Sequence, residues 1–211
     1  MAAYPSVPAP YGLKPINLIG GQVFAGATRQ LPITTSSVSY NTAIFNGDVI
    51  QIGSDGTIIV STLAAQTTGS VRGVIGVFLG CSYTNPVTKQ KLFSQYWPGY
   101  SSGVTDAVAY ISDDPDALYK VVSVGDTANT TGLTPVALSQ TTLGNNVALV
   151  LNTGSTVTGD SKIGIYANGD TAGLPMRVVD LVPDTATSAG FFEVIVKFNF
   201  GYHSYQQLAG I

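Results

Sequence analysis

The sequence has few charged residues, and glutamate is almost absent among them. The 211 residues include 9 Lys and Arg and 12 Asp and Glu, so that charged residues make up 10% of the chain, compared with about 25% in a typical soluble domain. Glu193 is the single glutamate. A surface with so few charges repels copies of itself weakly. We therefore expect much of it to be covered by other protein in an assembly; the alternative is a soluble domain coated with Ser, Thr and Asn.

Basic residues, histidine and cysteine are also scarce, which excludes several classes of function. The net charge is −3 and the basic residues are scattered, with Lys89 and Lys91 as the only close pair; nucleic-acid binding needs clustered Lys and Arg. A zinc site needs more His and Cys than the chain has. Cys81 has no second cysteine to pair with, and we expect it to be a small buried hydrophobic residue. We expect no nucleic-acid partner, metal or other cofactor.

Long hydrophobic runs are absent from the sequence. No segment approaches the 18 continuous apolar residues of a membrane-spanning helix. Residues 1–5 have neither the basic region nor the apolar run of a signal peptide. We therefore expect that the chain does not associate with a membrane. Its single cysteine is consistent with folding in a reducing cytoplasm.

The sequence also offers few groups for catalysis. His203 is the single histidine, no Gly-x-Ser-x-Gly pattern opens a helix, and no Gly-x-Gly-x-x-Gly pattern is present. Asp113, Asp114 and Asp116 surround a proline, a pattern typical of a turn, and it lacks the ligand spacing of an EF-hand calcium loop. We favour the turn and leave calcium open. The chain is not expected to be an enzyme or to have a small-molecule substrate.

Residues that favour strands and turns take the place of the missing charges. The last strand is the clearest: one face carries Phe192, Val194, Val196, Phe198 and Phe200, and the other carries Glu193, Lys197 and Asn199. This is the period of a half-buried strand. No window of similar length has a helical period.

Turn residues and glycines predict further strands. Residues 44–52 and 57–63 flank an Asp-Gly turn and predict a hairpin. Glycines spaced through residues 71–83 predict a bent strand or a close backbone approach. Further strands are expected over residues 91–96, 107–111, 117–124, 147–151 and 174–182. The sequence thus predicts an all-β fold, an antiparallel β-sandwich or barrel of β-tulip or jelly-roll type.

The chain divides into two parts in this interpretation. Residues 1–15 contain four prolines and predict an extended N-terminal arm. Residues 16–211 form a single β-rich domain with long loops at about 125–145 and 153–161.

Two groups of residues are candidate contacts with a partner. The arm offers prolines and tyrosines that can anchor on a neighbour, namely Tyr4, Pro5, Pro8, Pro10 and Tyr11. Tyr96, Trp97 and Tyr100 form an aromatic group that suits a protein interface, and equally a stacking platform for sugars in a carbohydrate-binding module.

Several segments, taken in order, resemble a family of capsid decoration (cement) proteins of tailed bacteriophages of the marine and cyanobacterial type. These are residues 11–15 (Tyr-Gly-Leu-Lys-Pro), 45–50 (Phe-Asn-Gly-Asp-Val-Ile), 71–78 (Val-Arg-Gly-Val-Ile-Gly-Val-Phe), 109–119 around Asp-Asp-Pro-Asp, 152–161, 176–182 and 193–199. The aromatic residues at 198–205 differ from the polar end that is usual in such proteins.

The resemblance implies a structural protein that is synthesised in the cytoplasm of a bacterial host and lies on the outer surface of the capsid in the virion. It implies a homotrimer that binds the major capsid protein and clamps neighbouring capsomers together. Another virion component, such as a tail, fibre or head-completion protein, is the alternative within the same class.

Overall fold

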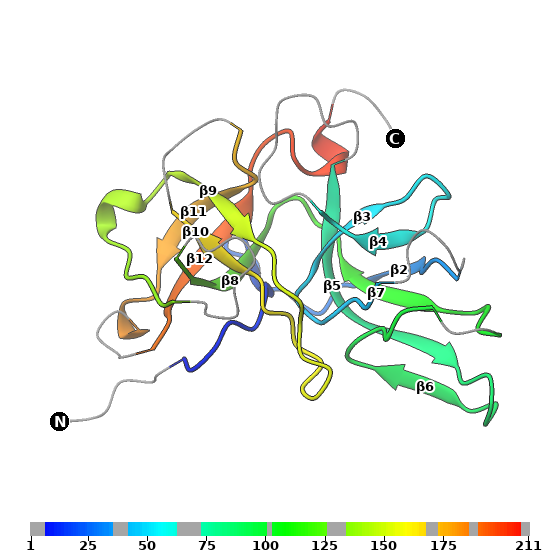
Figure 1. Ribbon diagram of the computed structural model, residues 1–211. Coiled ribbons are helices and arrows are strands. Elements are labelled where there is room, and N and C mark those ends of the chain that lie inside the picture. Colours follow the sequence, from blue (N-terminus) through cyan, green and yellow to red (C-terminus); the bar gives the residue numbers. More distant parts are fainter. Residues whose placement is uncertain are drawn as a thin grey trace.

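The computed structural model describes residues 7–35, 42–62, 73–100, 103–125, 134–167, 173–185 and 190–207. These residues form two β-sheets that lie side by side (Figure 1). The described part of the chain contains three short 3-10 turns and no α-helix: η1 (Gln140–Thr142), η2 (Pro183–Thr185) and η3 (Ser204–Gln206). The prediction of an all-β sandwich or barrel is confirmed.

The first sheet closes into a barrel. Its strands are ordered β1-β8-β10-β9-β11-β12, and β12 pairs in turn with β8, so that the last five strands form a closed ring. All pairings are antiparallel except that of β8 with β10. The strands are β1 (Lys14–Leu18), β8 (Ala117–Ser123), β9 (Asn146–Val150), β10 (Gly164–Tyr166), β11 (Met176–Leu181) and β12 (Phe192–Phe198). Closure leaves the ring without a free edge.

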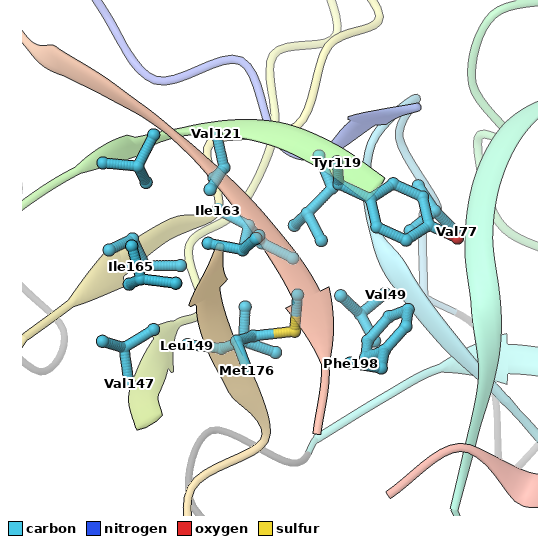
Figure 2. Packing of buried hydrophobic residues seen from close by; sticks show 14 of the residues in the cluster. Val49, Val77, Tyr119, Val121, Val147, Leu149, Ile163, Ile165, Met176 and Phe198 are labelled. Carbon is cyan, nitrogen blue, oxygen red and sulfur yellow. The ribbon is translucent and has the colours of Figure 1, made fainter. Parts of the chain in front are cut away.

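Alternating apolar residues fill the barrel. Tyr119, Leu149, Met176 and Phe198 are among those that point inward in Figure 2, and each is almost completely buried. Strand β12 places Phe192, Val194, Val196 and Phe198 in this core, as its period of two predicts.

The prediction for Phe200 is wrong. Strand β12 ends at Phe198, and the chain then turns, with the backbone N–H of Tyr202 donating to the carbonyl of Asn199 at 3.1 Å. This turn takes Phe200 out of the alternation and leaves its side chain 80% exposed.

The second sheet has the order β2-β7-β5-β3-β4, with β6 paired to the far half of β5. A parallel bridge between Ile33 and Ile58 connects the ends of β2 and β4. The strands are β2 (Arg29–Pro32), β3 (Val49–Ile52), β4 (Ile58–Val60), β5 (Val74–Thr84), β6 (Lys91–Ser94) and β7 (Val108–Ser112). The predicted hairpin is present as β3–β4. This sheet has its own apolar core around Phe78, Trp97 and Ile111.

Strand β5 bends where the spaced glycines predict a close backbone approach. Gly76 has a φ of 151°, and a Cβ atom at this position would lie 2.0 Å from the carbonyl oxygen of Ser112 on β7. Register shifts occur between Phe78 and Gly80 against β7, and opposite Ile50 of β3. Only glycine permits this contact between strands.

The two sheets share apolar contacts. Val49, Val74 and Val77 belong to the second sheet and pack into the barrel core, and Figure 2 shows Val49 and Val77 beside Phe198 and Tyr119. The predicted loop at 153–161 also connects the sheets, because Gly159 and Ser161 make backbone hydrogen bonds of 3.0 and 2.9 Å with Asn46.

The predicted boundary between arm and domain at residue 15 is wrong. Leu13 is completely buried in the barrel core, and Pro15 lies in β1, where it pairs with Tyr119. The carbonyl of Val7 accepts a hydrogen bond of 2.9 Å from the backbone of Phe191. From residue 7 onward the segment packs on the barrel because its apolar side chains cover the outer face of β8 and β9. Residues 1–6 lie outside the described residues.

Candidate functional site

The described residues of the predicted arm make contacts within the chain. Pro8 is exposed and Pro10 is buried. The hydroxyl of Tyr11 donates a hydrogen bond of 2.6 Å to Glu193, whose carboxylate also lies 3.0 Å from the ammonium of Lys120. Burial and the bond to Glu193 raise the pKa of Tyr11. Tyr11 therefore serves to hold the segment on the barrel.

Tyr4 and Pro5, the other predicted contacts of the arm, lie outside the described residues. Their role as partner contacts stays a prediction.

The aromatic group at residues 96–100 is not a flat platform on the surface. Trp97 is 1% exposed and packs edge-on against Tyr83, with ring centres 5.1 Å apart. Tyr96 stacks on Phe45 at 5.5 Å, and Tyr100 is half-buried. The prediction that Trp97 contacts a partner is wrong for this conformation, because its indole fills the core of the second sheet. A sugar could not stack on the Trp97 ring for the same reason, which argues against the carbohydrate-binding alternative.

Large apolar side chains are nevertheless exposed on the described surface. They are Ile19, Val23, Val87, Phe93, Leu143, Val157, Phe200 and Tyr205. Phe93 lies on β6 and is 76% exposed, and Val87 lies in the turn between β5 and β6 and is 86% exposed. Sequence reasoning missed both residues, because β6 reads Lys-Leu-Phe-Ser and its pattern does not show which face is buried.

The β5–β6 hairpin that carries these two residues is well defined. Figure 1 shows it projecting from the second sheet, away from the barrel. The side chain of Asn85 accepts hydrogen bonds from the backbone of Val87 and Thr88 at 2.9 and 3.1 Å, which fixes the turn. Among the described residues, β6 pairs with β5 alone, so its outer edge is open.

Charge beside the turn of this hairpin is neutralised locally. Lys91 lies 2.8 Å from Asp106, and Thr84 donates to the same carboxylate through its backbone and its hydroxyl. The bonds from Lys91 and Thr84 lower the pKa of Asp106. The hairpin thus presents apolar side chains beside a paired charge.

A second feature is a polar junction where three segments far apart in the sequence meet. The ammonium of Lys14 lies 2.8 Å from Asp160 and also donates to the side-chain oxygen of Asn46. The backbone N–H of Leu13 donates to Gly47 at 3.0 Å. Each segment carries part of the motifs behind the resemblance, and the structure brings these parts together between the two sheets.

Asp48 lies in the same junction and is buried. Burial raises its pKa to about 6, although hydrogen bonds from Ser161 and the backbone of Phe45, and the charge of Lys14, act in the opposite direction. Desolvation of a carboxylate is the dominant effect here. Asp48 therefore has a pKa well above that of an exposed aspartate.

The three aspartates that could have bound calcium form hydrogen bonds and ion pairs within the chain. Asp113 accepts hydrogen bonds from Arg29 and from Tyr205, at 3.2 and 2.9 Å. Asp114 accepts a bond of 2.8 Å from the backbone of Asp116, as in a turn, and Asp116 pairs with Lys197. In the described part of the chain no three His, Cys, Asp or Glu side chains form a metal-binding group. The arrangement is that of the predicted turn.

His203 and Cys81 are buried core residues. The Nδ1 atom of His203 accepts a hydrogen bond of 3.3 Å from the backbone of Tyr205, and burial lowers the pKa of its imidazole. Cys81 is 1% exposed and burial raises the pKa of its thiol to about 12. The expectation of a buried Cys81 is confirmed.

Comparison with protein-family models, with curated proteins and with solved structures gives no match. No helix within the described ranges has the length and apolar character needed to cross a membrane.

Proposed function

We propose that this chain is a structural virion protein that decorates the outer surface of a tailed-phage capsid and cements neighbouring capsomers. Its partner is the major capsid protein, and its own assembly is a homotrimer. The proposal follows the motif resemblance and the low charge of the chain, and it assigns no reaction to the protein.

The observation that carries the proposal is the pair of exposed apolar residues on the β5–β6 hairpin. Phe93 and Val87 leave most of their apolar area in water, and burial against a partner contributes about 25 cal/mol per Å². The open edge of β6 also offers backbone N–H and C=O groups to an added strand. A rigid hairpin with these two features suits contact with a large protein surface.

The test measures binding to shells assembled from the major capsid protein of the same virus. We expect Phe93→Ser to weaken binding by about 10-fold or more, because an aromatic side chain contributes roughly 1.5–3 kcal/mol when buried. Gln30→Ser is the matched control, since Gln30 is exposed on β2 of the same sheet. Both variants should unfold at the urea concentration of the parent chain.

Equal affinities of Phe93→Ser and Gln30→Ser would remove the hairpin from the interface. Absence of any binding by the parent chain contradicts the decoration role itself. A copy number of a few per particle, in place of hundreds, identifies a tail, fibre or head-completion component.

The oligomeric state has its own measurement. Light scattering or native mass spectrometry of the purified chain should give three times the monomer mass. A monomer at micromolar concentration contradicts a trimer formed before binding to the shell.

A further inference from the structure

The polar junction between the sheets contains a lysine, an asparagine and an aspartate in direct contact. Lys14 on β1 donates to the side-chain oxygen of Asn46, and its Nζ atom lies 2.8 Å from the carboxylate of Asp160. Asn46 and Asp160 are themselves partners in an isolated parallel β-bridge. An amine therefore lies against a carboxamide, with a carboxylate beside both.

The backbone around these three side chains is held in place. The Nδ2 atom of Asn46 donates a hydrogen bond of 2.6 Å to the carbonyl of Leu79, which fixes the plane of the amide. Backbone hydrogen bonds join Leu13 to Gly47 at 3.0 Å and Ser161 to Asn46 at 2.9 Å. A Cβ atom on Gly12 would lie 2.6 Å from that of Ser161, so the segments are as close as their backbones permit.

We propose that Lys14 and Asn46 become joined by an isopeptide bond between Nζ and Cγ, formed by the folded chain itself with Asp160 as the group that transfers protons. The side chains of Lys14 and Asp160 are 29% and 33% exposed, so the reacting groups are partly shielded from water. Holding an amine beside an amide in a fixed geometry replaces a bimolecular encounter with an intramolecular step.

The reaction balances without any external reagent. Asp160 takes one proton from the Lys14 ammonium, and the neutral amine adds to Cγ of Asn46. Two protons in all pass through the Asp160 carboxylate from Nζ to Nδ2, the Cγ–Nδ2 bond breaks, and the nitrogen leaves as ammonium. An ammonium and a carboxamide thus become a secondary amide and a free ammonium ion, and no group is oxidised or reduced.

The bond would connect the two sheets covalently. Lys14 belongs to the strand attached to the barrel, and Asn46 precedes β3 of the second sheet. A cross-link here would keep the sheets together under load. This inference does not depend on the identity of the partner.

The test is the mass of the full-length purified chain. We expect it to be lower than the sequence mass by one ammonia molecule, and a proteolytic digest should yield a branched peptide that contains both Lys14 and Asn46. Lys14→Arg and Asn46→Ala should restore the full mass. Lys120→Arg is the matched control, because Lys120 pairs with Lys14 across the same strands and should leave the mass loss intact.

Asp160→Asn tests the proton transfer. We expect a mixture of linked and unlinked chains in which the linked fraction grows slowly with time. Complete linkage at the rate of the parent chain would exclude Asp160 from the reaction.

The peptide digest of the parent chain tests the proposal even if a variant fails to fold. An unlinked Lys14 peptide in the digest of the parent chain overturns it. An ammonia loss confined to the Asn46–Gly47 peptide also overturns it, because that product is a succinimide formed with the adjacent backbone and contains no link to Lys14.

Discussion

At the scale of single residues, burial determines the direction of the pKa shifts of Asp48 and His203. Asp48 and His203 are both buried, and in each case desolvation disfavours the charged form, which raises the pKa of the aspartate and lowers that of the histidine. The two shifts act on stability in opposite directions. Asp48 binds extra protons in the folded chain, whereas His203 binds fewer than it does in the unfolded chain.

Asp48→Asn should change how stability depends on pH. The pKa of Asp48 is about 6 in the folded chain against 3.8 ordinarily, so the folded chain binds more protons than the unfolded chain between these values. The free energy of unfolding should therefore fall by about 3 kcal/mol because of this group as pH rises from about 3 to about 7. Urea unfolding at several pH values measures this loss, and Asp48→Asn should lack it.

His203 contributes to both pH profiles, so the difference between the parent chain and Asp48→Asn cancels its effect. Its lowered pKa means that stability is lost as pH falls below about 6.5. Parallel profiles for the two chains would show that Asp48 is not desolvated as described.

Trp97 shows why residue type alone misleads about location. Aromatic residues are common both in interfaces and in cores, and the sequence around Trp97 contains no period that separates the two. The surroundings of Trp97 are set by Tyr83 on β5 and by the core of the second sheet. These neighbours come from elsewhere in the sequence.

At the scale of elements, strands with a clear alternation or an adjacent turn signal were predictable, and a short strand with neither was not. Strand β12 alternates over its full length, and the prediction found it. Strand β10 has three residues, too few for a period, and the prediction missed it. The first two residues of strand β1 were assigned to the arm because of Pro15, yet β1 pairs with β8 at the end of the sheet order, where a missing backbone N–H is tolerated.

Gly76→Ala should disrupt the contact between β5 and β7. Its Cβ atom would lie 2.0 Å from the Ser112 carbonyl at a φ that only glycine adopts readily, so we expect a loss of at least about 3 kcal/mol in the free energy of unfolding. Gly20→Ala is the control, because nothing lies within 4 Å of its Cβ position. Urea unfolding of both variants measures the difference, and equal stabilities would contradict the close approach.

At the scale of the whole molecule, the barrel and the second sheet are connected by the N-terminal segment and the loop at 152–161. Leu13 enters the barrel core, Lys14 reaches Asn46 and Asp160, and Ser161 bonds to Asn46. The N-terminal segment therefore has a structural role from residue 7 onward. Any role in binding a partner belongs to the residues before it or to its exposed side.

Two deletions should separate these roles. Removal of residues 1–6 should leave the urea unfolding midpoint unchanged and, if Tyr4 and Pro5 contact the capsid, reduce the number of copies bound per shell. Removal of residues 1–15 should destabilise the fold by several kcal/mol or prevent folding, because it takes Leu13 out of the core and Lys14 and Pro15 out of β1. A stable fold after the longer deletion would contradict the packing of this segment.

The sequence by itself determined the all-β class, the buried cysteine, the hairpin at β3–β4 and the last strand, because local periods and turn residues carry that information. The closed barrel, the burial of Trp97, the exposure of Phe93 and the meeting of Lys14, Asn46 and Asp160 were decided by the tertiary structure alone. Each of these depends on pairing between residues that are distant in the chain, and such pairing leaves no local pattern in a single sequence.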